Sequence, residues 1–216
     1  MTATARRRRS PRGQGARLRG ELIAAATELL ARLGDAERLS IRAVATAAGV
    51  TPPSLYRHFD DKQALLRAVL EERFAEFERF QAEADAGAAD PFDALRRRCR
   101  AYLRFAEEHP GHYRVLFGAA GLGSELGTDV RGHPGAQAFF GLVGAVQRCL
   151  DAGAPVEGDS FVLAVELWAL VHGLVDLHNT RPGFPWPPLV AVTDAARAHM
   201  GLDGPAHSTD IAPGER

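Results

Sequence analysis

Hydrophobic residues recur along most of the chain at intervals of three and four, which is the spacing of amphipathic helices. Glycine or proline stands near most ends of these stripes, where helices stop readily. The pattern therefore predicts an all-α fold of about nine helices. They are expected at residues 17–33, as two short helices within 40–62, and at 60–84, 91–108, 112–117, 134–151, 159–179 and 188–200.

The stretch 40–62 reads as two short helices around a tight turn. Ser40 is a suitable N-cap, and the apolar residues that follow it recur at helical spacing on one face. Gly49 comes directly after them, where a positive φ is tolerated and a helix ends most easily. The apolar face of the first helix consists of Ile41, Val44, Ala45 and Ala48.

The second helix of this stretch begins near Thr51, which we expect to cap it. Two prolines follow, and their missing N–H groups cost little in a first turn. Leu55 and Phe59, four residues apart, are expected to anchor this helix to the first. Its other face carries only groups that form hydrogen bonds, namely Ser54, Tyr56, Arg57 and His58.

A small helix with such a polar face fits the major groove of DNA, where it reaches both bases and phosphates. Spacing alone leaves a second interpretation open, a solvated two-helix corner inside a helical protein. The particular residues favour the DNA-binding interpretation. The run Ala47-Ala48-Gly49-Val50-Thr51, the run Leu55-Tyr56-Arg57-His58-Phe59 and Lys62 together resemble the helix-turn-helix signature of TetR-family transcriptional regulators. The pair Pro52-Pro53 departs mildly from that signature, which usually has one proline or none there.

The resemblance implies an N-terminal three-helix helix-turn-helix DNA-binding domain and a C-terminal helical ligand-binding and dimerisation domain. The expected divisions are a disordered basic arm at 1–16, the DNA-binding domain at 17–63 with its motif at 40–59, a connecting helix at 64–86, the regulatory and dimerisation domain at 91–200, and a disordered tail at 201–216. The candidate DNA-binding residues are Ser40, Thr51, Ser54, Tyr56, Arg57, His58 and Lys62. Of these, Ser54 and Tyr56 are expected near the groove floor and backbone, and Thr51, His58 and Lys62 on phosphates.

Charge is distributed unevenly along the 216 residues. Residues 1–62 hold twelve basic and six acidic side chains, for +6, and the rest hold 14 basic and 21 acidic, for −7. A basic front on an acidic body suits a protein whose N-terminal part meets DNA. Arg6 to Arg9 lie in a stretch that is either a solvated tail or an arm that tracks phosphates.

Several classes of protein are not indicated. No segment approaches about 18 apolar residues and no secretory signal is visible, so no membrane partner and a cytoplasmic location are expected. No phosphate-binding loop or nucleophile elbow is present, which predicts no enzyme, no catalytic residue and no cofactor.

Cys99 and Cys149 lack metal-type spacing; they are either free buried thiols or a redox-sensing pair. His109 and His112 invite a metal site, but the sequence predicts none.

The helix at 159–179 contains Trp168, His172 and Gly173, which resemble the body type of TetR regulators named for a Trp-His-Gly motif. The histidine is either a satisfied core or interface residue or part of a ligand cavity. The candidate ligand-binding residues are Tyr102, Phe105, Phe117, Phe139, Trp168 and His172. By resemblance the last two helices form the homodimer interface, with Phe161, Val165 and Gly173 as its candidate residues.

The function that these observations predict is a ligand-responsive DNA-binding regulator. In this interpretation a dimeric repressor leaves a palindromic operator in double-stranded DNA when a small apolar effector, not yet identified, binds its body. A ligand-independent repressor or architectural protein, and a transcriptional activator, are the alternatives that the sequence leaves open.

Overall fold

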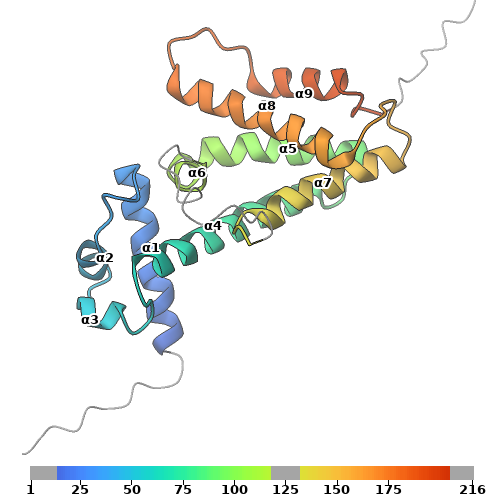
Figure 1. Ribbon diagram of the computed structural model, residues 1–216. Coiled ribbons are helices and arrows are strands. Elements are labelled where there is room, and N and C mark those ends of the chain that lie inside the picture. The colour runs from blue at the N-terminus through green and yellow to red at the C-terminus, as the bar shows by residue number, and fades with distance from the viewer. Residues whose placement is uncertain (1–13, 118–131, 205–216) are drawn as a thin grey trace, which may run out of the picture. The chain divides into compact units, whose positions relative to one another are not determined.

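The computed structural model describes residues 14–117 and 132–204, and all of its regular structure is helical (Figure 1). Nine helices and no strand occur in these residues, which confirms the predicted all-α fold. The helices are α1 (Gln14–Leu33), α2 (Ile41–Ala47), α3 (Pro52–Leu55), α4 (Lys62–Asp85), α5 (Pro91–Glu108), α6 (Pro110–Phe117), α7 (Ala136–Asp151), α8 (Ser160–Thr180) and α9 (Leu189–His199).

The chain divides into two compact units, and α4 runs from one into the other. The first unit contains α1 to α3, α4 as far as Phe74, and α6; the second contains the rest of α4 together with α5, α7, α8 and α9. The sequence suggested a division near residues 87–91, at the turn between α4 and α5. The compact units do not follow that division, because α6 packs with α1 and the second half of α4 contacts α5 through aromatic rings and ion pairs.

The first unit is built around α1, which packs against α2 and α6. Its inward side chains Leu22, Ile23 and Ala26 are almost fully buried. The approach of α6 is close, because a Cβ atom built on Gly111 would lie 2.9 Å from the Cβ of Ala31. Only glycine allows α6 to lie this near to α1.

Local signals set most helix ends, with two exceptions. The Ser40 hydroxyl accepts a hydrogen bond from the Ala43 N–H at 3.1 Å, which confirms the predicted cap of α2. Thr51 occupies the predicted N-cap position of α3, but its side chain makes no capping hydrogen bond. At the start of α4 the cap is Asp61, whose carboxylate accepts from the Ala64 N–H at 2.7 Å. The expected range 60–84 began at the adjacent Asp60, and the helix begins at Lys62, two residues later.

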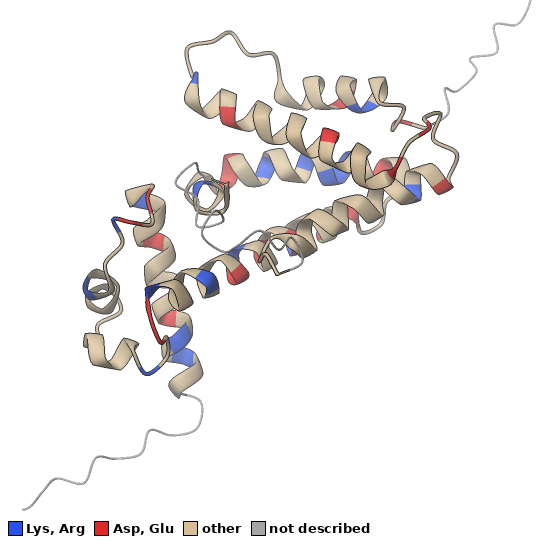
Figure 2. Cartoon of the chain, in the orientation of Figure 1, with Lys and Arg blue, Asp and Glu red and all other residues tan. Residues whose placement is uncertain are grey.

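In the second unit α5 packs against α7, α8 and α9. Its apolar side chains Leu95, Tyr102 and Phe105 are buried, and the blue positions on α5 in Figure 2 are its arginines. Phe105 lies edge-on to Phe77 of α4, with ring centroids 5.0 Å apart. This face of α5 is the core around which the second unit forms.

A buried arginine on the same face was not predicted. Arg98 donates to the Glu78 carboxylate at 2.8 Å and to the Asp85 carboxylate at 2.9 Å, and both acidic residues lie on α4. Burial raises the pKa of both carboxyl groups, while the Arg98 guanidinium acts to lower it. Gly141 of α7 covers this cluster so tightly that a Cβ there would lie 2.5 Å from Arg98 Nη2.

The helix α8 is apolar over most of its circumference and appears almost entirely tan in Figure 2. By length and composition alone it could cross a membrane, which corrects the prediction that no segment approaches this limit. Its Leu163, Leu167 and Val171 side is buried, and the helix packs on α5, α7 and α9. The opposite side of the helix is also apolar but exposed, at Phe161, Val162 and Val165.

Part of the predicted arm and tail is structured. The helix α1 begins at Gln14, three residues earlier than expected, and the rest of the arm lies outside the described residues. Leu202, placed in the tail by the sequence, is fully buried. Buried Arg197 donates to the Leu202 carbonyl at 3.2 Å and pairs with Asp203, so the chain is fixed as far as this point. Residues 205–216 of the predicted tail lie outside the described residues.

The tight cover over Arg98 predicts different effects for two glycines of α7. We expect Gly141→Ala to lower the free energy of unfolding by about 2 kcal/mol, because the new methyl group must displace a buried ion pair. Gly144→Ala is the matched control: its Cβ meets only Arg148 Nη1 at 3.6 Å, and alanine favours a helix. Urea unfolding followed by circular dichroism measures both, and equal stabilities of the two variants would contradict the packing described.

Candidate nucleic-acid interface and ligand site

The short helix α3 is stabilised by hydrogen bonds that continue beyond its last residue. The Tyr56 N–H donates to the Pro52 carbonyl at 3.1 Å, and the Phe59 N–H donates to the Leu55 carbonyl at 3.1 Å. Leu55 is fully buried and Phe59 is 3% exposed, as the sequence predicted. One side of the segment 52–59 is therefore fixed in the core of the first unit.

The turn before α3 depends on glycine. Gly49 has a φ of +67°, a conformation in which a side chain would be strained. The Val50 N–H then donates back to the Ala45 carbonyl at 2.9 Å and closes the end of α2. The two helices are in contact, so this segment is a helix-turn-helix.

The opposite side of α3 presents the predicted polar residues. Tyr56 is 51% exposed although its neighbour Leu55 is fully buried. The Ser54 hydroxyl accepts a hydrogen bond at 2.7 Å from Nη2 of Arg57, which is exposed. The hydrogen bond holds the guanidinium next to a hydroxyl, and both groups can bind phosphate or base edges.

The other predicted DNA-binding residues surround α3 in different ways. Thr51 is exposed, and Ser40 is exposed while it caps α2. His58 is half-buried near the first turn of α1, where a Cβ on Gly15 would lie 3.9 Å from its ring. Lys62 donates to the Glu37 carbonyl at 3.1 Å and so ties the start of α4 to the segment before α2.

The structure adds arginines that the residue-by-residue prediction missed. The Arg19 guanidinium lies 5.1 Å from the centre of the Phe59 ring, a cation–π contact on the segment that follows α3. Arg42 is exposed on α2. The excess of basic residues before position 62 was the only sequence signal for them, and it does not indicate which arginines lie near α3.

In the second unit the structure brings together four of the six predicted ligand residues. The Tyr102 hydroxyl and His172 Nδ1 are 3.1 Å apart. The His172 ring lies 5.9 Å from that of Trp168, which in turn lies 5.7 Å from Phe139. Burial lowers the pKa of His172, although the nearby Asp176 carboxylate acts to raise it. The histidine is thus a neutral hydrogen-bonding group at neutral pH, set among aromatic rings.

The other two predicted ligand residues have different partners. Phe105 packs with Phe77 and Phe80. Phe77 also lies edge-on to Tyr102, with ring centroids 5.3 Å apart, so Phe105 adjoins the cluster through this shared neighbour. Phe117 belongs to the first unit, where its ring lies 5.7 Å from Phe74. The sequence indicated that these aromatic residues would be buried, but it could not show which of them would contact one another.

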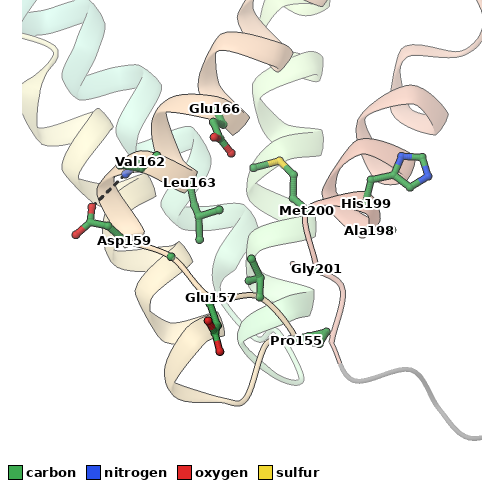
Figure 3. Close-up of a pocket in the computed structure, with 12 residues that line it drawn as sticks. Pro155, Glu157, Asp159, Val162, Leu163, Glu166, Ala198, His199, Met200 and Gly201 are labelled. Atoms are coloured by element: carbon green, nitrogen blue, oxygen red, sulfur yellow. Dashed lines mark hydrogen bonds between the residues drawn. The ribbon is translucent and has the colours of Figure 1, made fainter.

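A pocket of about 660 Å³ opens in the second unit between the first turns of α8 and the end of α9 (Figure 3). Asp159, which caps α8 through the Val162 N–H at 3.2 Å, lies on one side of it, and Met200 lies on the other. Glu157 and Glu166 add two further carboxylates. None of the six predicted ligand residues lines this pocket.

The two cysteines are free and buried, as predicted in the first of the two interpretations. Burial raises the pKa of Cys99 to about 12 and that of Cys149 to about 11. Thiols with such pKa values hold little thiolate at neutral pH, which does not favour a redox-sensing role. Among the described residues, no group of three or more His, Cys, Asp or Glu side chains is arranged to hold a metal ion.

Comparison with known proteins matches both parts of the chain to one family. Residues 22–69 match the family model of bacterial regulatory proteins of the tetR family, and residues 95–201 match the tetracyclin repressor-like C-terminal domain. The chain belongs to the tetR family. This is a family of DNA-binding transcriptional regulators with a helix-turn-helix, not of enzymes, and the segment α2–α3 lies inside the first matched region.

Individual relatives agree with the tetR assignment. The chain is 31% identical over 144 residues to an uncharacterized HTH-type transcriptional regulator of Mycobacterium tuberculosis; the match covers 67% of this chain and 62% of that protein. A Rhodococcus protein of unknown function shares its fold with 25% identity and a TM-score of 0.69, over 89% of this chain and 97% of that one. A putative transcriptional regulator from Pseudomonas aeruginosa has a TM-score of 0.71 at 21% identity, over 88% of this chain and 93% of that chain.

The burial of both cysteines predicts their reactivity in this tetR-family protein. At pH 8 we expect the folded protein to react with a disulfide reagent such as DTNB at least about 100-fold more slowly than in urea, because the thiolate fraction and access are both small. The rate of colour release measures this. Fast modification of either thiol in the folded protein would contradict the burial and restore the redox interpretation.

Proposed function

We propose that the protein is a dimeric transcriptional repressor that binds a palindromic operator through α2 and α3. The observation that carries this proposal is the two-sided arrangement of α3. Leu55 and Phe59 fix one side in the core, and the other side carries the exposed Tyr56 and Arg57 and the half-buried Ser54. A helix held in this way enters a major groove without rearrangement of the first unit.

The residues around α3 would divide the contacts between bases and backbone. Ser54 and Tyr56 are the candidates for the groove floor, and Arg57 can reach base or phosphate because its stem is exposed. Thr51 and Lys62 are candidates for phosphate contacts. The Lys62 ammonium group donates one N–H to the Glu37 carbonyl, and its other two N–H groups can donate to a phosphate. Phosphate contacts position the motif, and base contacts give it sequence preference.

A dimer of this chain would form through α8 and α9. Phe161 is 44% exposed and Val165 is 38% exposed on the outer side of α8, whose inner side is buried. A Cβ on Gly173 would meet no atom within 4 Å, so this glycine leaves room for a close approach from outside the chain. Two-fold pairing would allow the two α3 helices to enter successive major grooves about 34 Å apart.

The candidate effector site is the cluster of Tyr102, Phe139, Trp168 and His172. It combines aromatic rings with one hydrogen-bonded polar pair, which suits a small, mainly apolar molecule with one polar group. The assignment of the C-terminal part to the Trp-His-Gly type is also part of this proposal, because Trp168 and His172 of that motif lie in the cluster. Effector binding would favour an arrangement of the dimer that no longer fits its operator. A cytoplasmic location follows from this role.

The first test concerns sequence-specific binding. The full-length protein is used to enrich duplexes from a random pool, and the enriched duplex and a scrambled one are titrated by fluorescence anisotropy at two salt concentrations. Tight binding to the enriched duplex alone supports the proposal. Equal and steeply salt-dependent binding to both would contradict it, because it indicates charge attraction without base readout.

Two substitutions in α3 test which side meets the duplex. We expect Tyr56→Ala and Arg57→Ala each to weaken binding to the enriched duplex about 10- to 100-fold, since each removes an exposed group from the contact side. Arg57→Ala should also lower the salt dependence if it contacts phosphate. Arg32→Ala is the control, an exposed arginine in the last turn of α1. Wild-type affinity in both α3 variants, with dimers intact, would refute the role given to this helix.

The effector site is tested by a thermal-shift screen of small apolar compounds that carry one hydrogen-bonding group. Compounds that raise the Tm are expected to release the enriched duplex, and Tyr102→Phe should weaken both effects because it removes the hydroxyl paired with His172. Tyr113→Phe makes the same change at a buried tyrosine of the first unit. A failure of every compound to release DNA would favour the ligand-independent repressor instead.

A further inference from the structure

The segment that joins α8 to α9 is a stiff loop with two large aromatic side chains. Residues 181–188 read Arg-Pro-Gly-Phe-Pro-Trp-Pro-Pro, so prolines fix φ at four of eight positions. The Trp186 indole donates to the Arg181 carbonyl at 3.0 Å, and the Phe184 N–H donates to the same carbonyl at 3.1 Å. The loop therefore has a defined conformation of its own.

This conformation holds apolar side chains out in solvent. Phe184 is 56% exposed, the largest value among the large hydrophobic residues that the structure describes. Its ring lies 4.6 Å from that of Trp186, which lies 6.1 Å from His178. Figure 1 shows the loop rising clear of the ends of α8 and α9. A preorganised aromatic pair of this kind loses little conformational freedom when it binds.

The exposed apolar surface continues from the loop onto both helices. Leu177, in the last turn of α8, is 51% exposed, and Val190, in the first turn of α9, is 39% exposed. Both residues stand within seven positions of Phe184 along the chain. A surface that covers the outer sides of α8 and α9 would thus meet the loop as well.

The charges near the loop argue for a protein surface as the occupant. Arg181 is the only charged residue between 181 and 188, and α8 contributes Asp176 nearby. A lipid surface or a nucleic acid would require several cations here. An apolar protein surface requires none, and the outer side of α8 in a second copy, with Phe161 and Val165 exposed, is such a surface.

We propose that residues 181–188 form an arm that closes on a second copy of this chain, with Phe184 and Trp186 as its anchors. The inference rests on the dimer under Proposed function and adds a contact to it. In a two-fold dimer each protomer gives one arm and receives one. The aromatic pair then supplies a large part of the dimer affinity, as buried aromatic anchors do in other interfaces.

The experiment uses the fact that the chain has two tryptophans, Trp168 and Trp186. In a Trp168→Phe background the emission of Trp186 is followed through a dilution series, and sedimentation equilibrium gives the dimer constant. We expect the emission to shift to the blue as dimer forms. Phe184→Ser should weaken the dimer at least about tenfold. Phe140→Ser, which changes an exposed aromatic residue (41%) on α7, should leave the dimer constant unchanged.

The outcomes separate the arm from the dimer. One outcome is that a dimer forms, the Trp186 emission stays constant and Phe184→Ser has the same dimer constant as the parent. The arm contact is then refuted and the dimer stands. If the parent remains a monomer at every concentration, both are refuted. The emission of Trp186 in the parent background tests the arm even if Phe184→Ser does not fold, which circular dichroism would show.

Discussion

The burial of Leu55 and Phe59 is the constraint on which the first unit depends. These residues lie on one side of a segment only two turns long, so once they are packed the directions of Ser54, Tyr56 and Arg57 are fixed. The positive φ of Gly49 allows α3 to reach this position from α2. The surface proposed to meet DNA is therefore fixed by core packing, and under that proposal binding needs no separate ordering of the helix.

The second unit depends on a helix with two apolar sides. One side of α8 packs on α5, α7 and α9, and the other keeps Phe161, Val165 and the end of the helix near Leu177 exposed. Composition alone cannot separate a membrane span from a helix covered by a second protein chain. The packing of its inner side on three helices, and the tetR family to which the chain belongs, favour the protein partner.

Sequence predicted what short-range chemistry controls. Ser40 and Gly49 act within a few residues of their own position, and both were predicted at helix ends where the structure has them. The choice between Asp60 and Asp61 as a cap depends on where α4 begins, which packing decides. Arg98 was missed because arginine is usually exposed, although it stands three residues after Leu95 and four before Tyr102, on the apolar stripe. The partners of aromatic residues, such as those of Phe117, require the tertiary structure.

The contact between Lys62 and the Glu37 carbonyl has a chemical consequence. Lys62 is the only lysine in the 216 residues, and arginine provides every other basic side chain counted with it. Acylation of side-chain amines can therefore remove positive charge at one place alone, the first turn of α4, where it would also break the tie to the segment before α2. The remaining charge of the basic N-terminal part is permanent across the physiological pH range.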